Sequence, residues 1–89
     1  MPPSTPDQPT PAITPRQCRA ARGLLGWEQG ALAEASGVAR ATIIDFEASR
    51  TTPRRKTLAR LRTALETAGI RFLHDASETG VTLSPNPDV

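Results

Sequence analysis

The side chains with the most specific chemistry lie in residues 39–48, which read ARATIIDFEA. On a helix, Ile43 and Phe46 are three residues apart and would face inward together. An arginine can donate to guanine, a small apolar group can touch a thymine methyl, and an aspartate can accept from cytosine. We therefore interpret the outward residues as candidates for contacting DNA bases, namely Arg40, Ala41, Thr42 at the edge of the helix, Ile44 and Asp45.

Asp45 is informative because DNA phosphates would repel a carboxylate that lay close to them. A contact with a base, or a salt bridge to Arg40 or another arginine, would account for it. A simple role in keeping the helix soluble stays open as well.

A second group of residues could bind phosphate. Arg54, Arg55 and Lys56 follow Pro53, which we expect to open a helix. Cations in the first turn of a helix oppose its dipole, so three of them there favour an anionic ligand such as the DNA backbone. The alternative is a solvated basic run. We also expect Arg50, in the preceding loop, to contact phosphate.

Other chemistries find little support in the sequence. His74 is the sole histidine, and the sequence places no cysteine or serine partner near it. Asp45 and Glu47 face different sides of their helix, so they do not form an acid–base pair. Cys18 is the sole cysteine, and we interpret it as a small core residue. We therefore expect no enzyme activity, no cofactor and no metal site.

Four helices are predicted to position these residues. They should cover residues 14–25, 28–36, 39–48 and 53–68, and Gly69 should end the last one. Gly37 allows the positive φ that a tight turn between the second and third helices requires. Two helices joined by such a turn form a helix-turn-helix unit. Trp27, in the connection after the first helix, is expected to contribute more to the core than any residue of that helix.

The residues around this unit resemble those of a known family. Gly26–Gln29 reads GWEQ before the second helix, and Asp45–Glu47 reads DFE at the end of the third. Together with Arg22 they make the chain similar to phage repressor/Cro-type helix-turn-helix proteins, over roughly residues 16–69. The resemblance implies a buried structural salt bridge between Arg22 and Glu47. It also implies that Gln29 and the start of its helix contact DNA phosphate.

Beyond Gly69 the helical period changes to an alternation that predicts a β-hairpin. Its strands should cover residues 70–74 and 81–83, with a loop at 75–80. An isolated hairpin is marginal in water, so it must lean on the helices or on another chain. We expect a homodimer joined through Ile70, Phe72, Leu73, Val81 and Leu83. A hairpin folded onto its own helices in a monomer is the alternative.

The predicted fold is mainly α, a four-helix repressor-like domain at 14–69 with a C-terminal hairpin at 70–83. Six of the nine prolines lie in the first fifteen residues, so residues 1–13 should form a disordered tail. Residues 84–89 should form a second, flexible tail. All eleven lysines and arginines lie between Arg16 and Arg71, with five of the nine acidic residues. Such a basic segment favours a polyanionic partner.

These features predict a sequence-specific regulator of transcription that binds double-stranded DNA. It would act as a homodimer and read a palindromic operator in the major groove with helix 39–48. A protein-interaction module on the same scaffold, such as an antitoxin or adaptor, remains the alternative. No apolar run approaches the ~18 residues of a membrane span, and the N-terminus lacks a signal-peptide pattern. We therefore expect a cytoplasmic protein without a membrane partner.

Overall fold

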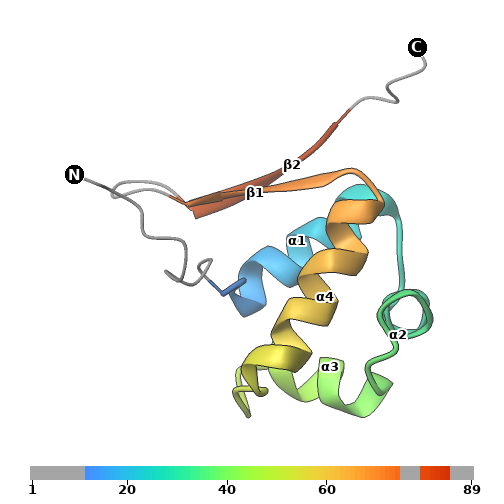
Figure 1. Cartoon of the computed structure of the whole chain (residues 1–89), viewed down its shortest axis with the longest axis vertical. Helices are drawn as coiled ribbons and strands as arrows, with labels where there is room; N and C mark the ends of the chain where they lie inside the picture. Colours follow the sequence, from blue (N-terminus) through green and yellow to red (C-terminus); the bar gives the residue numbers. More distant parts are fainter. Residues whose placement is uncertain (1–11, 75–78, 85–89) are drawn as a thin grey trace.

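A computed structural model describes residues 12–74 and 79–84 of the chain. Its helices are α1 (Pro15–Leu25), α2 (Gln29–Ser36), α3 (Arg40–Glu47) and α4 (Arg55–Thr67), and its strands are β1 (Ile70–His74) and β2 (Thr79–Leu83). The predicted mainly α class with a C-terminal hairpin is confirmed, and Figure 1 shows the hairpin at one end of the molecule and α3 at the other. Within these residues no helix is long and apolar enough to cross a membrane.

The first helix begins with a complete capping box. The Thr14 hydroxyl accepts from the Gln17 N–H, and the Gln17 side chain accepts from the Thr14 N–H, each at 3.0 Å. Pro15 stands at the first helical position, where its missing N–H leaves no bond unmade. The helix ends at Gly26, whose φ of 70° lies in the left-handed region. The sequence-predicted start and end of α1 are therefore confirmed.

The turn between α2 and α3 has the geometry that its glycine suggested. Gly37 has a φ of 75°, and its N–H donates to Ala33 O at 2.9 Å. Helices α2 and α3 are less well capped than α1, because neither of their N-cap residues, Glu28 and Ala39, makes a side-chain capping bond. The positions of α2 and α3 must therefore come mainly from contacts with the rest of the core.

That core draws residues from every helix and from the hairpin. Its fully buried members include Leu32, Ile43, Leu61 and Leu65. Trp27 is partly buried and packs against this core, while Cys18 and Ala21 of α1 are fully buried in it. The assignment of residue 13 to a tail is wrong, because the Ile13 side chain is buried in the core. Ala12 is exposed, and residues 1–11 of the predicted tail lie outside the described residues.

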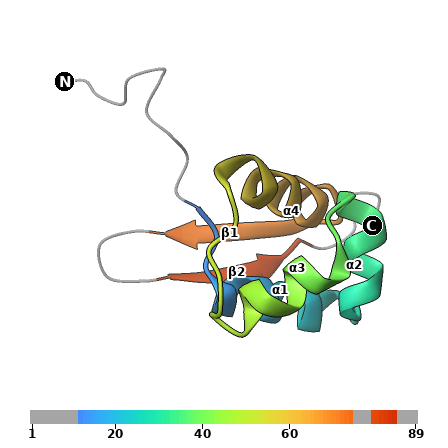
Figure 2. The same ribbon diagram turned by 90° about the horizontal axis from the view of Figure 1, so that it is seen from below.

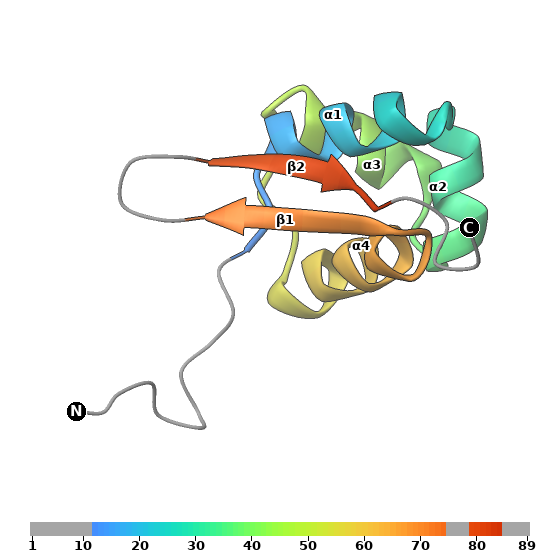
Figure 3. The same cartoon turned by 90° about the horizontal axis from the view of Figure 1, so that it is seen from above.

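The hairpin covers the helices on the side away from α3. Seen from above, β2 runs beside α1 and β1 beside α4 (Figure 3). The strands pair antiparallel, with Phe72 opposite Val81. The Gln17 amide donates to Leu73 O at 3.2 Å and to Gly80 O at 3.0 Å, so α1 holds both strands through one buried side chain. Ile70 is buried in the core of its own chain.

Some predicted boundaries need correction. The helix predicted from residue 53 begins at Arg55, because Arg54 is its N-cap and has an extended backbone. The helix predicted over 39–48 covers Arg40–Glu47, and the second strand starts at Thr79 instead of residue 81. Residues 75–78 of the predicted loop and residues 85–89 of the predicted tail lie outside the described residues.

Candidate nucleic-acid interface

The predicted base-contacting residues lie together on the outer face of α3. Arg40 and Ala41 are exposed at its first turn, while Thr42, Ile44 and Asp45 are partly exposed. Ile43 and Phe46 are buried, as their spacing predicted. Figure 2, viewed from below, shows α3 in front of the helices, with the hairpin behind them. The outer face of α3 is therefore open along its length.

Asp45 has an arginine partner on the loop that follows α3. Its carboxylate lies 3.3 Å from the Arg50 guanidinium, and both side chains are exposed. The Arg50 N–H also donates to Asp45 O at 2.8 Å, and the Ser49 N–H donates to Phe46 O at 2.9 Å. These two bonds form a Schellman motif, with Ser49 in the left-handed conformation at a φ of 61°. The turn thus brings Arg50, a predicted phosphate contact, next to Asp45, a predicted base contact.

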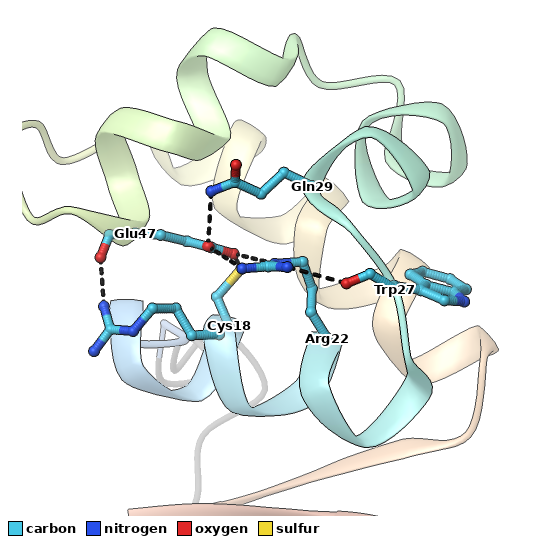
Figure 4. A network of polar contacts seen from close by, with 6 residues as sticks. Cys18, Arg22, Trp27, Gln29 and Glu47 are labelled. Carbon is cyan, nitrogen blue, oxygen red and sulfur yellow. Dashed lines mark hydrogen bonds and ion pairs between the residues drawn. The ribbon is translucent and has the colours of Figure 1, made fainter.

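The structure joins Arg22 of α1 to Glu47, the last residue of α3. Arg22 Nη2 lies 2.6 Å from Glu47 Oε1, and Arg22 Nε lies 2.7 Å from Oε2 (Figure 4). The remaining Arg22 nitrogen donates to Trp27 O at 3.0 Å, while the Trp27 indole points away from the pair. The glutamate is buried and the arginine is mostly buried. This bidentate pair ties helix α1 to α3.

Sequence reasoning missed three further partners of Glu47. The Cys18 thiol donates to Oε2 and the Gln29 amide donates to Oε1, each at 3.1 Å. Arg19 donates to the backbone oxygen of Glu47. Positions 18 and 22 are one helical turn apart, and this i, i+4 spacing was the available signal for Cys18. Arg19 is three residues before Arg22, so the same rule applies to it. No such spacing links Gln29 to this pair.

These donors control the ionisation of the cluster. Burial alone would raise the pKa of Glu47, but hydrogen bonds from Arg22, Cys18 and Gln29 outweigh it and hold this pKa below its ordinary value. Burial raises the pKa of the Cys18 thiol, and its hydrogen bond to Glu47 raises it further. The hydrogen bond to Glu47 raises the pKa of Arg22. The cluster is therefore an ionised pair with a neutral thiol.

Four of the five predicted phosphate contacts fall at two helix starts, and the fifth, Arg50, lies in the loop after α3. Arg54 is the N-cap of α4, Arg55 and Lys56 follow it, and all three are exposed. The first turn of α4 contains no acidic residue and no side-chain cap. Gln29 is the first residue of α2, but its amide is engaged with Glu47. The start of α4 is therefore the more open of these two anion sites.

Metal-binding clusters are not found in the described part of the chain. No group of three or more histidine, cysteine, aspartate or glutamate side chains there could hold an ion. Asp45 is paired with Arg50 and Glu47 with Arg22, so the carboxylates of α3 serve separate contacts.

A family model described as helix-turn-helix matches residues 19–69 of this chain. The match includes most of α1, all of α2, α3 and α4, and stops before the hairpin. It therefore contains the outer face of α3, the Arg22–Glu47 pair and the cationic start of α4. No curated protein matches the chain.

Proposed function

The chain belongs to the helix-turn-helix family of DNA-binding proteins, and from this premise we propose a sequence-specific regulator that reads a palindromic operator as a dimer. The observation that carries the proposal is the outer face of α3, where Arg40 and Ala41 are exposed and Asp45 is partly exposed, while Glu47 is fixed to α1. An eight-residue helix is about 12 Å long, and the DNA major groove is about 12 Å wide. The first turn of α3 would carry the readers Arg40 and Ala41 into that groove.

The cationic start of α4 supports a backbone contact beside this helix. Arg54, Arg55 and Lys56 surround the uncapped N–H groups of the first turn, so positive charge and helix dipole act on the same anion. Such contacts fix the position of a protein on the duplex and carry no sequence information. We assign these residues, with Arg50, to phosphate and the face of α3 to bases.

The experiment that tests the function has two parts. The purified full chain is first used to select binding sites from a random pool of DNA duplexes. Its affinity for the selected site is then measured from about 50 to 200 mM salt, where several phosphate contacts would weaken it by orders of magnitude. Failure to enrich any sequence, or binding without this salt dependence, would contradict the proposal and favour a protein-interaction module.

The dimer is proposed through the outer side of the hairpin. Leu73 and Leu83 are 41% and 39% exposed, and each strand of the two-stranded sheet keeps one edge without a strand partner among the described residues. Ile70 is unavailable, because it is buried in its own core. Phe72 and Val81 are partly buried, and the Arg62 guanidinium lies 5.1 Å from the centre of the Phe72 ring. Leu83 pairs with Ile70 and so lies on the face of the sheet that is turned to the helices, whereas Leu73 lies on the other face. The interface would therefore centre on Leu73 and a strand edge, with Leu83 at its margin.

Sedimentation of the full chain at tens of micromolar tests this interface. Leu73→Asp should convert a dimer to a monomer, because it places a charge in an apolar contact. Leu24→Asp is the matched control, since Leu24 is a similarly exposed leucine on α1. A monomeric wild type, or a dimeric Leu73→Asp variant, would contradict this interface.

A further inference from the structure

The Glu47 carboxylate is held from two helices at once. Arg22 donates to its two oxygens at 2.6 and 2.7 Å, Cys18 donates to Oε2 at 3.1 Å, and Gln29 donates to Oε1 at 3.1 Å. An ionised carboxylate offers about four acceptor positions, and these four hydrogen bonds use that number. Cys18 and Arg22 belong to α1 and Gln29 to α2, so the carboxylate is fixed along two directions.

The opposite end of α3 is held by the preceding turn, whose Val38 is buried in the core, and among the described residues no side-chain hydrogen bonds comparable to those on Glu47 hold it. Its N-cap Ala39 makes no side-chain capping bond, and Arg40 and Ala41 are exposed. At the last residue, by contrast, Arg19 also donates to the backbone oxygen of Glu47. The first turn of α3 would enter the groove, so a small rotation about its fixed end would move Arg40 relative to the bases.

We propose that Cys18 and Gln29 are positioning residues for base reading, which act by holding Glu47 and thereby the direction of α3. This inference rests on the proposed function, because it concerns how the same helix meets DNA. It adds two residues to the matched Arg22–Glu47 pair and gives the sole cysteine of the chain a polar role.

Cys18 offers the cleaner test, because its side chain is fully buried and cannot touch DNA. Its thiol stays protonated and remains a donor to Glu47. Any effect of this residue on base preference must therefore pass through the protein. Cys18→Ser keeps a donor at this position, whereas Cys18→Ala removes it and leaves one carboxylate position unfilled.

Gln29 is partly exposed, unlike Cys18. Its amide nitrogen carries two hydrogens, and the bond to Glu47 uses one of them. The other is free to meet a phosphate at the start of α2, so one side chain could join the DNA backbone to α3. Gln29→Met keeps the length of the side chain and removes its donors.

The experiment compares base discrimination among full-length variants. Affinity is measured for the selected operator and for a duplex with one changed base pair opposite Arg40, at a temperature where circular dichroism shows each protein folded. The concentration of active protein in each preparation is measured by stoichiometric titration. We expect Cys18→Ala and Gln29→Met to reduce the ratio of the two affinities about fivefold to tenfold, within the range of one typical intramolecular hydrogen bond. Cys18→Ser should retain the wild-type ratio.

Leu58→Ala is the control for lost stability, because Leu58 is a core residue of α4 with no bond to Glu47. It should lower the unfolding temperature and leave the affinity ratio unchanged. A contact of Gln29 with phosphate alone would weaken both duplexes equally and also leave the ratio unchanged.

Several outcomes would overturn the proposal. Unchanged discrimination in both Cys18→Ala and Gln29→Met would do so, as would an equal loss in Leu58→Ala. If Cys18→Ala does not fold, Gln29→Met alone decides, since that side chain is partly exposed. A wild-type chain that shows no sequence preference would overturn the proposed function itself, which separates the two failures.

Discussion

Helix α3 contributes the carboxylate to two carboxylate–arginine pairs, one of them buried and the other exposed. Glu47 meets Arg22 at 2.6 Å, with side-chain exposures of 3% and 18%. Asp45 meets Arg50 at 3.3 Å, with side-chain exposures of 44% and 67%. The two carboxylates are two residues apart, yet the first is anchored to α1 and the second lies on the outer face. Burial therefore divides the helix into a fixed inner side and an outer side that can change partners.

The difference teaches what each pair can contribute. Removing one partner from a buried pair leaves a charge without compensation and is strongly destabilising. An exposed pair is screened by water and contributes little to stability. The inner pair thus supports the position of the helix, while the outer pair can exchange its bond for one to DNA at small cost.

The largest effect should come from breaking the inner pair. Arg22→Met keeps the apolar part of the side chain but leaves Glu47 buried without its cation. We expect the free energy of unfolding to fall by about 3–5 kcal/mol, measured by urea unfolding of the full chain. Arg50→Met is the matched control on the outer pair. A loss below about 1 kcal/mol for Arg22→Met would mean that burial does not separate the two pairs.

Acid should remove the contribution of the inner pair. Since the folded-state pKa of Glu47 is depressed, its contribution is present above the pKa of an unfolded glutamate, near 4.3, and is lost as pH falls through the folded value. Wild-type unfolding temperature should therefore decrease below about pH 4.3. Arg22→Met should show a smaller decrease. Equal acid sensitivity in both proteins would assign the effect to other carboxylates.

The inner and outer sides of α3 differ in how far the sequence could predict them. The spacing of Ile43 and Phe46 predicts which face of α3 is buried. The fold class is predicted in the same way, from the spacing of apolar residues along each helix and strand. The Arg22–Glu47 contact came from a matched family pattern. For Gln29 the family pattern predicts a phosphate contact but not the bond of its amide to Glu47. That bond depends on how α2 packs beside the end of α3, and no local sequence spacing records this geometry. The burial of Ile13 likewise depends on packing between distant parts of the chain, which no local sequence spacing records.

Arg40→Ala addresses the outer side alone. Arg40 is exposed at the first turn of α3, so its loss should leave the fold unchanged. We expect loss of preference at one base pair per half-site, with a cost of about 1–3 kcal/mol in binding. Repeating the site selection with the variant measures this directly. An unchanged preference would remove Arg40 from the reading face.

Glycine at position 49, in the turn between Glu47 and Arg50, should stabilise the protein. Ser49 has a φ of 61°, a conformation that favours glycine. Ser49→Gly keeps the backbone bonds of the Schellman motif and relieves this strain. We expect a gain of about 1 kcal/mol in the free energy of unfolding, measured by urea unfolding. Ser49→Ala, which retains a Cβ, is the control and should give no such gain.

The smallest effect should come from the outer pair itself. A double-mutant cycle with Asp45→Asn and Arg50→Met measures its coupling, which we expect to be about 0–1 kcal/mol in stability. The backbone bond from Arg50 to Asp45 remains in every variant, so the turn keeps its shape. A coupling above about 2 kcal/mol, closer to a buried pair, would show that the outer side is also fixed. Weak coupling would leave Asp45 free to accept from a base and Arg50 free to bind phosphate.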